Sequence, residues 1–149
     1  MTTEPLFAPN RVFLRLKAAT KQALLGELSS RAGLALGLDP AAVLQALQAR
    51  EQLGSTGVGA GIALPHARME AVQRIVGFFA KLERPVPFDA IDGKPVDLVV
   101  MLLSPQAGPG AGQHLAALAQ VARQLRNPIT AEAIRGLDDA GAVGVILNG

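Results

Sequence analysis

The sequence contains no cysteine, and this absence excludes several kinds of chemistry at once. Disulfide bonds, thiolate metal sites and a cysteine nucleophile are all ruled out. Only two histidines are present, and neither belongs to an H-E-x-x-H motif. A zinc enzyme is therefore not indicated, and we expect no metal site.

Long apolar runs and strong charge are missing too. No uninterrupted apolar run approaches the ~20 residues that a membrane span requires. The opening residues, MTTEPLFAPNRVFLRL, have no basic region followed by a long apolar stretch, so no signal peptide is expected. The formal net charge is only +2, and no run of lysine and arginine stands out. We therefore expect a cytoplasmic protein that neither inserts into a membrane nor binds nucleic acid.

Common nucleotide and hydrolase motifs are also missing. The Gly-Lys pair in DGKPV is followed by proline, where a P-loop needs serine or threonine and then a helix. The glycines of GVGAGIAL do not fit G-x-G-x-x-G, because an apolar residue occupies the last position. Ser55 or Ser104 with His66 and Asp89 or Asp97 could form a triad on paper, but no nucleophile-elbow sequence supports it.

The sequence is rich in apolar residues, and segments with helical spacing of these residues alternate with segments that have strand spacing. Half of the 149 residues are apolar, enough for one domain over residues 1–149 with a substantial core. Helical and strand patterns alternate, which predicts a sheet with helices packed on its faces. The run VDLVVMLL at 96–103 is typical of a central strand buried on both faces. Further strands are expected at 11–16, 62–64 and 74–82, helices at 21–35, 40–50 and 114–125, and loops at 85–94 and 106–112. Thr20 and Asp39 are the expected caps of the first two helices, Thr130 and Gly136 bracket a short one, and Asp138 or Asp139 starts the last.

The most informative stretch is REQLGSTGVGAGIALPHARME at residues 50–70. Gly57, Gly59 and Gly61 recur at every second position, a spacing that allows N–H groups to converge into an anion-binding concavity. The apolar strand 62–64 and a proline then bring His66 to the point where the strand ends. The plainer interpretation is a turn followed by a surface histidine; the other is an imidazole beside a phosphate site.

Two further residues are candidates for that site. Val43, Leu47 and Arg50 share one helix face, so Arg50 extends the apolar face just before the glycine turn. It could cap terminal carbonyls or point its guanidinium across the turn at His66. His114 lies in the first turn of a helix, where the dipole favours an anion and lowers the histidine's own pKa.

The 50–70 stretch, together with PVPFDAIDGKPVDL at 85–98, resembles the enzyme IIA domains of the fructose, mannitol and nitrogen-regulatory type from the bacterial phosphoenolpyruvate-dependent phosphotransferase system. The resemblance covers the chain from about residue 11 to the last helix, and the nitrogen-regulatory branch matches best. It implies an α/β/α sandwich with a mixed central sheet, formed by one type-2 IIA domain. It also implies that His66 accepts a phosphoryl group on Nε2, with Arg50 and His114 beside it and Arg68 supporting donor docking. No cofactor and no metal are implied.

The family resemblance leaves three functions open. In the first, the chain is a regulatory phosphocarrier, charged by a histidine phosphocarrier protein and controlling potassium transport components or sensor kinases. In the second, it is a sugar-specific IIA protein that passes phosphate to a IIB domain for fructose or mannitol uptake. The nitrogen-type motifs and the lack of a fused IIB or membrane segment favour regulation. A binding module with an inert histidine is the third, since Ala60 and Ala67 stand where asparagine and glycine are common in the family.

Overall fold

The computed structural model describes residues 5–108 and 112–149, so residues 109–111 of the loop expected at 106–112 lie outside the described residues. The elements are, in chain order, η1 (Pro9–Arg11), β1 (Val12–Leu16), α1 (Lys21–Leu36), α2 (Pro40–Gln52), β2 (Gly57–Gly59), β3 (Ile62–Ala63), β4 (His66–Arg68), β5 (Val76–Val86), β6 (Val96–Ser104), α3 (Gln113–Arg126), α4 (Pro128–Gly136) and α5 (Ala140–Asn148).

The strands form one mixed sheet centred on β6. The strand order is β1-β5-β6-β3-β2, and β4 also pairs with β6. Strand β6 runs antiparallel to β5 but parallel to β3 and β4. All of its residues except Asp97 are buried, as expected for a central strand covered on both faces.

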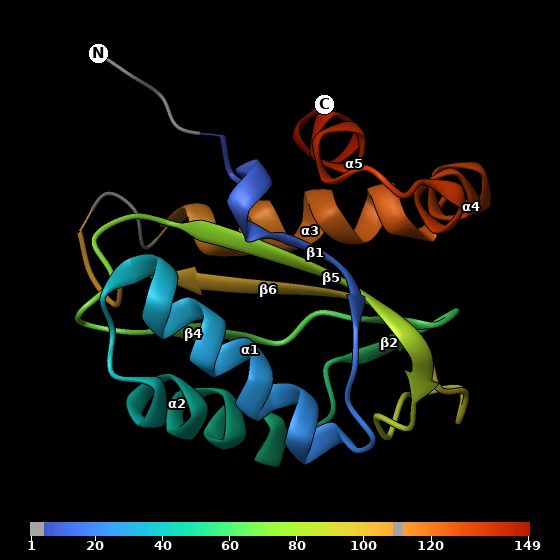
Figure 1. The fold of residues 1–149 in the computed structure, drawn as a ribbon. Coiled ribbons are helices and arrows are strands. Elements are labelled where there is room, and N and C mark those ends of the chain that lie inside the picture. The colour runs from blue at the N-terminus through green and yellow to red at the C-terminus, as the bar shows by residue number, and fades with distance from the viewer. Residues whose placement is uncertain (1–4, 109–111) are drawn as a thin grey trace.

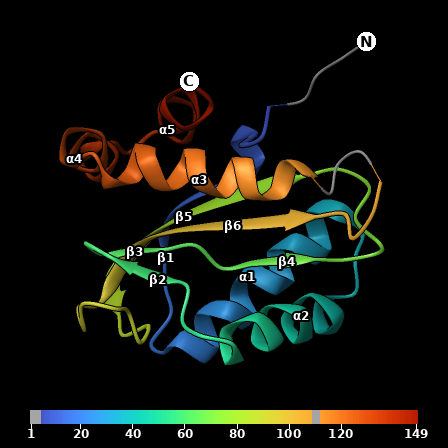
Figure 2. The same cartoon turned by 180° about the vertical axis from the view of Figure 1, so that it is seen from behind.

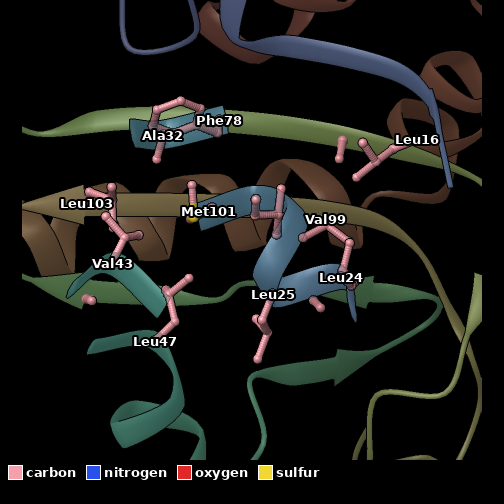
Figure 3. Packing of buried hydrophobic residues seen from close by; sticks show 14 of the residues in the cluster. Leu16, Leu24, Leu25, Ala32, Val43, Leu47, Phe78, Val99, Met101 and Leu103 are labelled. Carbon is pink, nitrogen blue, oxygen red and sulfur yellow. The ribbon is translucent and has the colours of Figure 1, made fainter. Parts of the chain in front are cut away.

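Helices cover both faces of this sheet. Figures 1 and 2 show α1 and α2 on one side and α3, α4 and α5 on the other. Alternate residues of β6 point to opposite faces: Val99, Met101 and Leu103 pack with α1 and α2 (Figure 3), whereas Leu98, Val100 and Leu102 pack with the C-terminal helices. The predicted mixed sheet with helices on both faces is confirmed.

Helix caps explain where the helices begin. Thr20 and Asp39 accept hydrogen bonds from backbone N–H groups at the starts of α1 and α2, as the sequence predicted. Asp139 does the same for α5. The expected start of the short helix at Thr130 was wrong, because Asn127 caps α4 by accepting from the N–H of Ile129. Pro128 then takes the first helical position, where its missing N–H costs nothing.

Strand β5 is longer than the sequence indicated. It continues to Val86, which pairs with Val96, so the loop expected at 85–94 begins later. The register of the pairing shifts between Lys81 and Val86. Pro85 lies inside this irregular stretch, where a residue without an N–H is tolerated.

The strand expected at 62–64 does not end at His66. Strand β3 stops after Ala63, Leu64 and Pro65 leave the strand, and β4 resumes at His66 parallel to the same partner β6. His66 pairs with Leu102 in this second segment. The prediction of a strand ending at the histidine was therefore wrong: proline breaks the ladder, and the strand restarts behind it.

Candidate active site

His66 is held by its own backbone neighbourhood. Its Nδ1 lies 2.8 Å from the carbonyl oxygen of Leu64, two residues earlier. A carbonyl only accepts, so Nδ1 carries the proton and donates it. Nε2 is then the unprotonated nitrogen, whose lone pair can accept. The break in the strand at Leu64 and Pro65 creates this contact, because it brings the Leu64 carbonyl within reach of the ring.

Arg50 approaches the opposite side of the same ring from the last turn of α2. Its Nε donates to Nε2 of His66 at 3.2 Å, and its Nη1 donates to the carbonyl of Gly54 at 3.0 Å. Both roles considered for Arg50 are thus realised: the side chain binds a carbonyl at the helix end, and it points at the imidazole. The bond to Gly54 holds the guanidinium plane in place over Nε2.

His114 is the third member of the cluster. It is the second residue of α3, it is 3% exposed, and its ring centroid lies 5.1 Å from that of His66 with the planes 57° apart. Its Nδ1 lies 2.5 Å from Oγ of Ser104, the fully buried last residue of β6. Residues of four elements therefore meet at this point: α2, β4, β6 and α3.

The environment favours neutral rings. Burial lowers the pKa of His66, Arg50 and Arg68 lower it further, and the Leu64 carbonyl and Glu51 oppose the shift. The pKa of His114 is lowered to about 4, first by burial and then by the charges of His66 and Arg68. The expected direction for His114 agrees, but burial rather than the helix dipole is the main cause. At neutral pH both imidazoles are uncharged, so Nε2 of His66 keeps its lone pair.

The glycines are not placed with the two histidines. Gly59 pairs with Ile62, which lies beside Leu98 of β6, whereas His66 lies beside Leu102. Four residues of strand span roughly 13 Å, which is too far for an N–H to reach a group on His66. Gly61, at the same end, faces the guanidinium of Arg135 instead.

Gly57, the nearest of the three glycines, pairs with Ala63 on the outer side of β3 and packs against Ala90. The structure thus places Gly59 and Gly61 away from His66, and a phosphate-binding role of the three glycines stays a prediction. Their spacing serves a hairpin, in which Gly59 and Gly61 adopt positive φ angles of 98° and 81°.

Sequence reasoning missed three groups of the site. The Leu64 carbonyl depends on backbone geometry and leaves no sequence signal. The sequence offers Ser104 only as a possible hydrolase nucleophile, although a serine at the end of an apolar strand is unusual. Glu51 accepts hydrogen bonds from the backbone N–H and the hydroxyl of Thr56, and the sequence motif assigns it no role. Arg68 is exposed in β4, two residues after His66.

Neither a metal site nor a membrane span is found in the part of the chain that the structure describes. No three potential ligand side chains gather there, and no helix is long and apolar enough to cross a membrane.

Comparison with known proteins decides the family. The model of the family described as "Phosphoenolpyruvate-dependent sugar phosphotransferase system, EIIA 2" matches residues 5–148. The chain belongs to this EIIA 2 family. The resemblance stated from the sequence motifs is thereby confirmed.

Two relatives place this EIIA 2 protein near the nitrogen regulatory proteins. It is 42% identical over 147 residues to the nitrogen regulatory protein of Bradyrhizobium diazoefficiens, covering 99% of this chain and 95% of the relative. The crystal structure of nitrogen regulatory protein IIA-Ntr from Neisseria meningitidis matches with a TM-score of 0.90 and 34% identity, over 95% of this chain and 96% of that one.

The crystal structure of IIA mannitol from Escherichia coli has the same fold. It matches with a TM-score of 0.77 at 24% identity, covering 94% of this chain and 97% of that one.

Proposed function

We propose that this EIIA 2 protein accepts a phosphoryl group on Nε2 of His66 from a histidine phosphocarrier protein, itself charged from phosphoenolpyruvate through enzyme I. The observation that carries the proposal is the bond from Nδ1–H of His66 to the Leu64 carbonyl, which leaves Nε2 as the nucleophile. In the transfer, the P–N bond of the donor breaks and its electron pair returns to the donor nitrogen. The lone pair of Nε2 forms the new P–N bond, while Nδ1 keeps its proton and its partner.

The neighbours of His66 fit this chemistry. Transfer between two nitrogens passes through a loose, in-line transition state, in which positioning and charge stabilisation dominate. The guanidinium of Arg50, now donating to Nε2, can move that donor to a phosphoryl oxygen as the bond forms. His114 is neutral and buried, so it serves as a partner for the ring or the phosphate and not as a second acceptor.

We further propose that the phosphorylation state of His66 controls target proteins, such as potassium transport components or sensor kinases. The likeness to nitrogen regulatory proteins over nearly the whole chain supports this regulatory role. The alternative is a sugar-specific IIA protein that passes phosphate to a IIB domain, and the description of the family as a sugar phosphotransferase system favours it. Incubation of the phosphorylated protein with fructose- and mannitol-type IIB domains separates the two, because only a transport protein discharges its label onto them.

Labelled phosphoenolpyruvate, enzyme I and the phosphocarrier protein test the acceptor. We expect one phosphate per chain at His66, lost in mild acid and stable in base, as a phosphoramidate requires. The His66→Ala variant should take up no label but should still bind any partner that recognises the unphosphorylated form. The His114→Ala variant is the matched control and should still be labelled at His66. Full labelling of His66→Ala, an acid-stable label, or a requirement for ATP would contradict the proposal.

A further inference from the structure

Glu51 follows Arg50 in the last turn of α2. Its side chain is only 7% exposed. Oε1 accepts from the backbone N–H of Thr56 at 3.0 Å and lies 2.9 Å from Nζ of Lys21, the first residue of α1. Oε2 accepts from the Thr56 hydroxyl. One buried carboxylate therefore joins the start of α1, the end of α2 and the turn that leads into β2.

The contact with Thr56 continues, bond by bond, to the reactive ring. The N–H of Leu64 donates to the carbonyl of Thr56 at 2.9 Å. The carbonyl of Leu64 in turn accepts from Nδ1 of His66 at 2.8 Å. Glu51 is thus linked through two backbone carbonyls to the nitrogen that fixes the His66 tautomer.

The other side of the ring depends on the same residue. Arg50 precedes Glu51 in the helix, so anchoring the Glu51 side chain fixes the turn from which the guanidinium reaches Nε2. Since Nδ1 and Nε2 are both constrained from this one point, the geometry points to a positioning role. We propose that Glu51 is a positioning residue that holds the His66 ring and the Arg50 guanidinium in register for phosphoryl transfer; this inference rests on the function proposed above.

Replacing the carboxylate by an amide should leave the fold intact, because Lys21 has other partners. Its Nζ lies 3.8 Å from a carboxylate oxygen of Asp89 and 4.5 Å from the ring centroid of Phe88. The hydroxyl of Ser55 separately ties the turn to the carbonyl of Phe88 at 2.7 Å. A glutamine at position 51 also retains an oxygen for the N–H of Thr56. Glu51→Gln should therefore keep much of the phosphoryl-transfer rate that Glu51→Ala loses.

Two measurements test the proposal on folded protein. The first is the transfer rate from the charged phosphocarrier protein, resolved into the rate at saturating donor and the KM for the donor. Misplacing a reacting group slows chemistry steeply, so we expect Glu51→Ala to lower the saturated rate about tenfold and Glu51→Gln about threefold. The KM should not change, because a side chain this buried cannot touch the donor. Glu27→Ala, which removes a half-exposed partner of Arg31 in α1, is the control and should change neither.

The second measurement is nitrogen NMR of the His66 ring in the unphosphorylated protein. The wild type should show a single tautomer with the proton on Nδ1, and Glu51→Ala a mixture of both tautomers. Thr56→Val removes only the hydroxyl donor and should show a smaller change in the same direction, which keeps the test open if Glu51→Ala does not fold. An unchanged tautomer together with an unchanged saturated rate in the folded variants would overturn the positioning role. If the wild type takes no phosphate at all, the proposed function fails, whereas the NMR measurement still decides the role of Glu51.

Discussion

At the scale of single residues, Ser104 is the support of His114. Its hydroxyl is the partner found for the buried Nδ1 of that ring. Ser104→Ala leaves a buried ring nitrogen unsatisfied, so we expect the free energy of unfolding to fall by about 1–3 kcal/mol. The saturated phosphorylation rate of His66 should fall as well, because the second ring loses its fixed orientation. Urea titration and transfer kinetics measure the two effects. Ser29→Ala is the control: Ser29 is similarly buried, but its hydroxyl donates to the carbonyl of Leu25 within α1, and its loss should leave the rate unchanged.

Arg50 offers a sharper test at the same scale. Arg50→Ala removes a charge-assisted donor from the position that the phosphate would take, and we expect the transfer rate to fall roughly a hundredfold. Arg50→Lys restores the charge without the planar fork of donors and should recover part of the rate. Both variants should unfold at nearly the wild-type urea concentration. An unchanged rate in Arg50→Ala would show that Arg50 has a structural role, as a hydrogen-bond donor to the Gly54 carbonyl.

The sequence indicated some of these residues and not others for a physical reason. The residues alone left a surface histidine and a helix-capping arginine open, and it was the family resemblance that assigned His66, Arg50 and His114 to one site. The structure places all three together, and their roles stay predictions. No local sequence pattern predicts Ser104, Glu51 or the Leu64 carbonyl. Their contacts form only when β4, α2 and α3 pack together.

At the scale of elements, the hairpin of β2 and β3 depends on the backbone of Gly61. Its φ is +81°, and an added Cβ would lie 2.8 Å from both Nη2 of Arg135 and Oδ1 of Asp97. Gly61→Ala should therefore lower the free energy of unfolding by about 1–3 kcal/mol through strain and a disturbed ion pair. The phosphorylation rate per folded molecule should not change, since the hairpin tip lies far from His66.

Gly26→Ala is the matched control for that prediction. An added Cβ at Gly26, inside α1, meets no atom within 4 Å. Alanine should increase stability there by about 0.5–1 kcal/mol. A fall in the transfer rate of folded Gly61→Ala would instead show that the glycine turn contributes to phosphoryl transfer.

Element boundaries show where sequence patterns are weak. The caps of α1, α2 and α5 were predicted, because a capping side chain bonds to its own helix within three residues. The end of β5 and the interruption between β3 and β4 were not predicted. Both are decided by pairing with β6, a strand distant in the sequence.

At the scale of the whole molecule, the buried histidines predict a loss of stability in acid. His114 has a pKa of about 4 in the folded state, whereas an exposed histidine in the unfolded chain titrates near ~6.5. Between these values only the unfolded chain takes up the proton, so stability falls as the pH drops from about 6.5 towards 4. The lowered pKa of His66 acts in the same direction.

We expect His114 alone to remove about 2 kcal/mol of stability between pH 7 and pH 5. Urea titrations of the wild type and His114→Gln at both pH values measure this contribution, because glutamine does not titrate. Equal acid sensitivity in the two proteins would contradict the assignment of His114 as a buried neutral base.

The central position of β6 in the sheet determines which parts of the molecule unfold first. It is hydrogen-bonded to β5 along one edge and to β3 and β4 along the other. Amides in such a strand exchange with deuterated solvent only when the entire sheet opens. His66 pairs with Leu102 of β6, and Ser104 at the end of β6 contacts His114. Both histidines are therefore held by the strand that we expect to unfold last. Deuterium should therefore reach the 59–61 hairpin long before Leu102, and on heating, phosphoryl acceptance should persist until the sheet itself is lost.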